Sequence, residues 1–180
     1  FSHPLVPKPV PEWWFDKEKA GGGALLDLGY HLIDIFNWMF GDLELEFSTL
    51  GYRFGLPIED SATVVLKSTR NGVNGIVNSG WFSKMIFPNF NFRINLNGTV
   101  GYVSTDHFAP RNLYLHAIKE ATLNLFRRAV GKRVHYLSYT YYYASFVKVL
   151  DLFFEAIRED TSIPVSLESQ LEVIKAIEAV

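Results

Sequence analysis

The stretch GGGALLDLGYHLIDIFNWMFG, residues 21–41, is the part of the sequence that most strongly indicates the fold. Three glycines free the backbone just before an apolar run that begins at Ala24. Between residues 25 and 40 the apolar side chains recur at steps of three and four, which predicts a largely buried helix. Gly41 follows as the expected C-terminal cap. We therefore expect the domain to be organised around this helix.

The polar residues of the predicted helix share one narrow stripe. At roughly 100° per residue, a stripe about 120° wide holds Asp27, Tyr30, His31, Asp34, Asn37 and Trp38. Asp27 and His31 are four residues apart, so they are neighbours on one helix face. Imidazole ordinarily titrates near neutral pH, so a histidine beside a carboxylate is suited to moving protons. This pair is the first candidate for a catalytic site.

Two other interpretations of the pair stay open. Asp27 and His31 can be an ordinary polar pair on a solvated face, or they can supply two ligands to a metal ion. The metal interpretation is weaker because the chain has no cysteine and no other histidine at ligand spacing. His107 lies far along the sequence, but the fold could bring it near the pair as a further ligand.

Length and composition limit the class of protein. The 180 residues suit a single domain, residues 1–180, with enough material for a core. The 17 basic and 19 acidic residues nearly balance, which argues against nucleic-acid and membrane-surface partners. The absence of cysteine indicates a cytoplasmic protein without disulfides, and the first residues lack the pattern of a secretory signal. The one long apolar stretch contains Asp27, His31 and Asp34, so no membrane span is expected.

After Gly41 the period changes from that of a helix to that of strands. Alternation with one slip over residues 43–54, typical of a β-bulge, is followed by strands at 61–68, 73–83, 90–96 and 99–103. Asn71-Gly72 and Asn97-Gly98 are typical hairpin turns, so neighbouring strands should be antiparallel. Strands and helices do not alternate, which argues against a doubly wound parallel sheet.

Helices are expected again in the second half of the chain. They cover residues 113–130, the segment that follows the tyrosines at 139–143, and a last helix that begins near Ser166. The sequence thus predicts an α+β fold, a predominantly antiparallel open-faced β-sheet with helices packed on one face. Because the strand at 63–66 is apolar at both parities, we expect a second copy to cover the open face and make a homo-oligomer.

The stretch 21–41 also resembles a known signature. The run from Gly21 through Asp27, Gly29, His31 and Asp34 to Gly41 is similar to the start of the C-terminal domain of the Gfo/Idh/MocA family, which includes glucose–fructose oxidoreductase and inositol dehydrogenase. Residues 163–166, before the last helix, resemble the family's ending. The resemblance covers nearly the whole chain, but only residues 21–41 are specific. In that family the Asp and His of a D-x-x-x-H step lie in the active site, and they match Asp27 and His31.

The resemblance implies an NAD(P)-dependent oxidoreductase that acts on a secondary alcohol of a sugar or cyclitol. His31 would exchange the hydroxyl proton, and Asp27 would bind the substrate or His31. NAD or NADP would be bound mainly by an N-terminal Rossmann domain that carries the family's Glu-Lys-Pro lysine. This chain has no G-x-G-x-x-G, phosphate-binding loop or Glu-Lys-Pro. We therefore expect that domain, and every cofactor-binding residue, to be absent from the chain, which alone would be inactive.

Further substrate contacts and other functions follow less directly. Trp14 stands just before the predicted helix, and Lys84 lies just past the Trp81-Phe82 strand end, so both are candidate substrate-binding residues. No metal-binding residue is predicted. The alternative function is a non-catalytic binding or dimerisation module in which Asp27 and His31 satisfy each other. A metal-dependent hydrolase is a more distant possibility.

Overall fold

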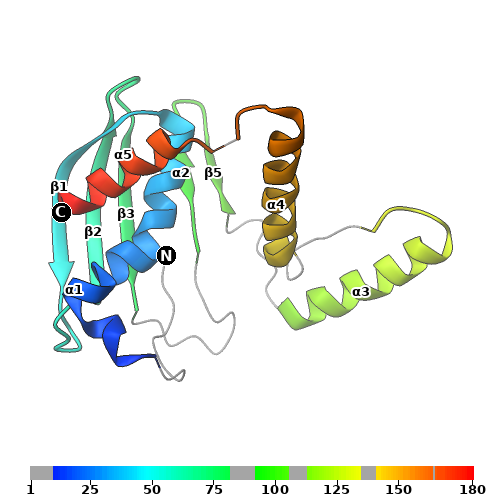
Figure 1. Cartoon of the computed structure of the whole chain (residues 1–180), viewed down its shortest axis with the longest axis horizontal. Coiled ribbons are helices and arrows are strands. Elements are labelled where there is room, and N and C mark those ends of the chain that lie inside the picture. The colour runs from blue at the N-terminus through cyan, green and yellow to red at the C-terminus, as the bar shows by residue number, and fades with distance from the viewer. Residues whose placement is uncertain (1–9, 82–91, 106–112, 135–140, 164) are drawn as a thin grey trace. The chain divides into compact units, whose positions relative to one another are not determined.

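A computed structural model describes residues 10–81, 92–105, 113–134, 141–163 and 165–180 (Figure 1). The chain forms two compact units. The first contains residues 1–92 and 165–180, and the second contains residues 93–164.

The first unit contains a three-stranded antiparallel sheet. Its strands β1 (Leu43–Gly51), β2 (Ser61–Ser68) and β3 (Asn74–Gly80) lie in the order β1-β2-β3. The pairing of β1 with β2 shifts between Leu45 and Phe47, so the bulge that the slip in the alternation predicted is present in this strand. The predicted hairpin joins β2 to β3, and Gly72 has φ +69 in it; because Asn71 has no positive φ and the N–H of Gly72 donates to the carbonyl oxygen of Ser68 at 2.9 Å, the turn is a longer loop than the two-residue Asn-Gly type.

Two helices cover one face of this sheet. After the short helices η1 (Glu12–Phe15) and α1 (Lys17–Ala20), a π-helical turn, η2 (Leu25–Gly29), leads into α2 (Tyr30–Phe40). Gly41, with φ +70, caps α2 by donating its N–H to the carbonyl oxygen of Asn37 at 2.7 Å, as predicted. The last helix, α5 (Leu167–Glu178), begins after Ser166, whose Oγ accepts the N–H of Ser169 at 3.1 Å. Figure 1 shows α2 and α5 side by side against the sheet.

The core of the first unit lies between these helices and the sheet. Alternate residues of β2 face inward and pack with α2 and α5; the buried set includes Ala62, Val64, Leu66, Ile33, Phe36, Val173 and Ala176. The residues between them point to the other face of the sheet, which stays accessible: Phe47 is 58% and Ile76 is 69% exposed. One covered and one open face are the arrangement that the alternation predicted.

The second unit contains a hairpin and two helices. Strands β4 (Asn95–Asn97) and β5 (Tyr102–Ser104) pair with each other in a separate two-stranded sheet, and α3 (Leu113–Ala129) and α4 (Tyr141–Glu159) follow. The prediction of one sheet therefore holds only for β1, β2 and β3. Of the predicted strand at 90–96, residues 90 and 91 lie outside the described residues, residues 92–94 are not in a strand, and residues 95 and 96 belong to β4. Helices with antiparallel sheets confirm the α+β class. Within the described ranges, every helix is too short or too polar to cross a bilayer.

Candidate active site at the start of the central helix

Asp27 lies in the π-helical turn that precedes α2. This turn closes with the N–H of Tyr30 bonded to the carbonyl oxygen of Leu25, five residues back, instead of the usual four. The carboxylate is half-buried, and its Oδ2 accepts a hydrogen bond from Nε1 of Trp81 at 2.8 Å. Single π-helical turns inside helices are frequent at functional sites. The sequence period predicted a continuous helix here and gave no sign of the wider turn.

His31 follows one turn later, in the first turn of α2, and its side chain is exposed. Its ring meets that of Tyr30 edge-on, with the centroids 5.7 Å apart and the planes at 77°. The first half of the predicted stripe therefore contains two different groups. The Asp27 carboxylate is held by the buried Trp81, and the His31 imidazole is accessible to solutes. A group that exchanges protons with a substrate needs such access.

The rest of the stripe joins two helices. The Tyr30 hydroxyl donates to Oε1 of Gln170, while Nε2 of Gln170 donates to Oδ1 of Asp34 at 2.9 Å. Nδ2 of Asn37 donates to Oγ of Ser169 at 3.1 Å. Burial, and secondly the charge of Asp34, raises the pKa of the Tyr30 phenol above its usual value, so the hydroxyl stays protonated and donates. Tyr30, Asp34 and Asn37 of α2 therefore hold α5 against α2.

A carboxylate from a distant part of the chain caps the start of this helical segment. The buried Glu59 accepts, through Oε1, the backbone N–H groups of Gly23 at 2.7 Å and Leu25 at 3.1 Å. Its carbonyl oxygen accepts the N–H of Ala24 at 2.9 Å. The N–H groups at a helix start need partners, and Glu59 supplies them in place of a local cap. Sequence reasoning missed Glu59; three glycines before a helix, with no capping side chain beside them, were the available signal.

Trp81 was also missed as a site residue. It directly follows β3, is 1% exposed, and packs with Ala24, Leu28 and Ile58. Trp14, the predicted substrate contact, packs with Phe15 against this same cluster and is partly buried. The other two candidates, Lys84 and His107, lie outside the described residues.

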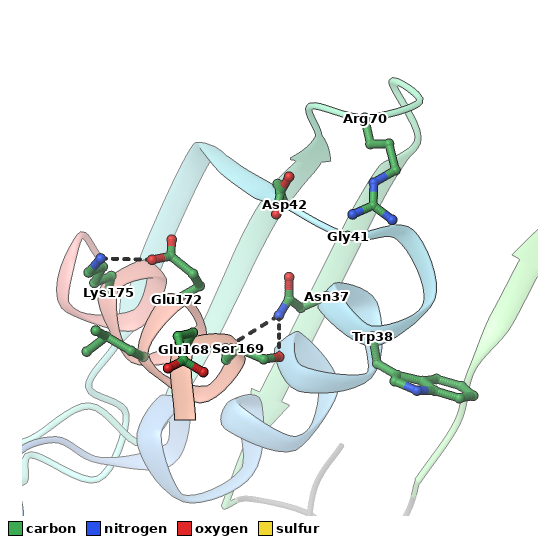
Figure 2. A pocket seen from close by; sticks show the side chains of 10 residues that line it. Asn37, Trp38, Gly41, Asp42, Arg70, Glu168, Ser169, Glu172 and Lys175 are labelled. Atoms are coloured by element: carbon green, nitrogen blue, oxygen red, sulfur yellow. Dashed lines mark hydrogen bonds and ion pairs between the residues drawn. The ribbon is translucent and has the colours of Figure 1, made fainter. Parts of the chain in front are cut away.

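A groove of about 630 Å³ lies elsewhere on the first unit, at the C-terminal end of α2 (Figure 2). Its lining comes from α2, from the β2–β3 turn and from α5, and includes Asn37, Trp38, Arg70, Ser169 and Glu172. Neither Asp27 nor His31 lines it. The Arg70 guanidinium lies over Gly41, where a Cβ would be 2.6 Å from Cζ, and a cation at this helix end suits the dipole. We assign this groove no part in the chemistry of the pair.

The glycine run and the described side chains also bear on cofactors and metals. The N–H groups of Gly23 and Leu25 are bonded to Glu59, so the start of this helix does not fit a dinucleotide phosphate. Across the described residues, no group of three or more His, Cys, Asp or Glu side chains is arranged to hold a metal ion.

Comparison with protein families identifies the family of the chain. Residues 1–104 match the model of the GFO/IDH/MocA C-terminal domain, which is more than half of the 180 residues. The matched segment contains Asp27, His31, Glu59 and Trp81. No curated protein matches the chain.

Proposed function

Because the chain belongs to the Gfo/Idh/MocA family of oxidoreductases, we propose that it is the substrate-binding and dimerisation half of an NAD(P)-dependent enzyme that acts on a secondary alcohol of a sugar or cyclitol. The observation that carries the proposal is the pairing, one turn apart, of an anchored carboxylate with an exposed imidazole. A polyol offers hydroxyl groups to both, and only one of these groups needs to lose its proton.

In this proposal the two side chains have different tasks. His31 takes the proton of the reacting hydroxyl during oxidation and returns it during reduction, with help from a lysine of the nucleotide-binding domain. Asp27 accepts a hydrogen bond from a neighbouring substrate hydroxyl or from His31, and so orients the alcohol. The chemistry that NAD or NADP would supply is the acceptance or donation of hydride at the alcohol carbon.

The cofactor belongs, in this proposal, to an N-terminal Rossmann domain of the whole protein. The glycine run of this chain does not fit a dinucleotide, because Glu59 already binds its N–H groups. The cytoplasmic location stays a prediction that depends on the absence of cysteine.

An activity screen of the whole enzyme tests the proposed function. We expect NAD- or NADP-linked oxidation of at least one member of a panel of sugars and cyclitols. We expect the isolated chain of residues 1–180 to show no turnover and no NAD(P) binding by calorimetry. A whole enzyme that is inactive on the entire panel, or cofactor binding by the isolated chain, contradicts this division of labour.

The alternative is a non-catalytic binding or dimerisation module. It is favoured by one observation, that Tyr30, Asp34 and Asn37 of the same stripe hold α5 to α2. The two functions predict different results when Asp27 or His31 is substituted in the whole enzyme. The catalytic function predicts a loss of turnover, and the non-catalytic module predicts no change.

The dimerisation part of the proposal concerns the open face of the sheet. Phe47, Val65 and Ile76 lie in register across the three strands, and they form an apolar row on that face. A second copy would cover this row and remove its apolar surface from water. The proposed occupant is the same face of another protomer.

We expect the wild-type protein to be dimeric at tens of micromolar and the Ile76→Asp variant to be largely monomeric, because a charge would be buried in the apolar row. Sedimentation velocity measures both. Val100→Asp places the same charge at a fully exposed apolar residue of the second unit and should leave the dimer intact. A monomeric wild-type protein contradicts the proposed interface.

A further inference from the structure

The indole of Trp81 is fixed on several sides. Its ring packs in the buried cluster of Ala24, Leu28 and Ile58, and its backbone N–H donates to the carbonyl oxygen of Asp60 at 2.9 Å. Asp60 is itself fully buried, with its carboxylate accepting the N–H of Phe54 at 2.7 Å and the hydroxyl of Ser61 at 3.0 Å. The one polar hydrogen of the indole is donated from this rigid setting to Oδ2 of Asp27.

The π-helical turn brings Asp27 within reach of this donor. Gly29 ends the turn and lies against β3: a Cβ there would be 2.6 Å from Cδ1 of Leu25 and 3.2 Å from the hydroxyl of Ser79. The missing side chain therefore permits a close approach of the turn to the strand that ends just before Trp81. The turn and the indole together determine where the carboxylate points.

We propose that Trp81 is a positioning residue for Asp27, which it holds in the single orientation that presents the carboxylate to the substrate. This inference rests on the proposed function of Asp27. Trp81 is buried and does not itself need to touch the substrate. The rate of a catalysed reaction falls sharply when a catalytic group is displaced. If the Asp27 carboxylate loses its donor and turns away, turnover should therefore fall about 10- to 100-fold.

The Trp81→Phe variant of the whole enzyme removes the donor and keeps a ring in the cluster. We expect kcat to fall about 10- to 100-fold. Phe15→Leu, which changes packing at the edge of the same cluster, should stay within about threefold of wild type. Should Trp81→Phe fail to fold, incorporation of benzothienylalanine at this position keeps the double ring and deletes only the N–H.

A double-mutant cycle separates positioning from a general effect on the fold. In an Asp27→Ala background, Trp81→Phe should have almost no further effect on kcat, because there is no carboxylate left to aim. Effects that multiply in the two backgrounds overturn the proposal, as does a crystal structure of Trp81→Phe with Asp27 in its wild-type rotamer. If Asp27→Ala impairs turnover but Trp81→Phe does not, only the positioning role fails. If Asp27→Ala is fully active, the proposed function fails as well.

Discussion

His31→Ala in the whole enzyme is expected to lower turnover by about 10²- to 10⁴-fold, the range that a positioned proton donor or acceptor typically contributes. The side chain is exposed, so its removal should hardly change the free energy of unfolding. Steady-state kinetics on the substrate found in the polyol screen measures the effect. Loss of turnover without loss of thermal stability is the expected combination.

The matched control for His31→Ala is Trp38→Ala, a change at an 83% exposed side chain about two turns further along α2. It should leave turnover within about threefold of wild type. Normal turnover in His31→Ala would remove the imidazole from the mechanism and favour the binding-module alternative.

The second prediction with a large expected effect concerns the stability of the folded protein. Gly23→Ala would place a Cβ 2.0 Å from the carbonyl oxygen of Glu59 and 2.9 Å from its Cδ, which no rotamer change can relieve because one of the two atoms is backbone. The backbone of Glu59 must move away, and with it the bonds to Gly23, Ala24 and Leu25. Breaking a buried hydrogen-bond network of this kind should cost about 3–5 kcal/mol.

Calorimetry or thermal denaturation followed by circular dichroism measures this loss. A destabilisation of that size lowers the midpoint of unfolding by roughly 6–20 °C for a chain of this length. Gly101→Ala is the matched control, because a Cβ at Gly101 meets nothing within 4 Å. It should change the stability by no more than about 0.5 kcal/mol. Equal midpoints for the two variants would show that Glu59 does not hold the start of the helix.

Regular features of the fold were predictable because they depend on local pattern. The α-helix over residues 30–40, its cap at Gly41 and the hairpin around Gly72 each depend on a few neighbouring residues, and each appears where the sequence indicated. The π-helical turn was not predictable from local pattern, and the groups that surround it come from distant parts of the chain: Glu59 accepts the N–H groups at its start, and Gly29 lies close to Ser79 of the sheet. Such tertiary contacts leave no local period.

The candidate site shows the same limit. Spacing alone placed Asp27 and His31 one turn apart. It could not show which polar side chains of the stripe would face solvent and which would contact another helix. Tyr30 and Asp34 turned out to bind Gln170, which lies far along the chain. From the sequence, Trp81 stands at the end of a predicted strand. Nothing near it in the sequence indicated that its indole N–H would reach Asp27.

The central claim is that Asp27 and His31 contact the alcohol that reacts. A crystal structure of the whole enzyme with its cofactor and its polyol tests this most directly. We predict the reacting hydroxyl within about 2.6–3.2 Å of the His31 imidazole, with Asp27 bonded to the same polyol or to His31 and still held by Trp81. A polyol bound elsewhere, for example in the groove beside Trp38 and Arg70, with neither side chain in contact, would contradict the account.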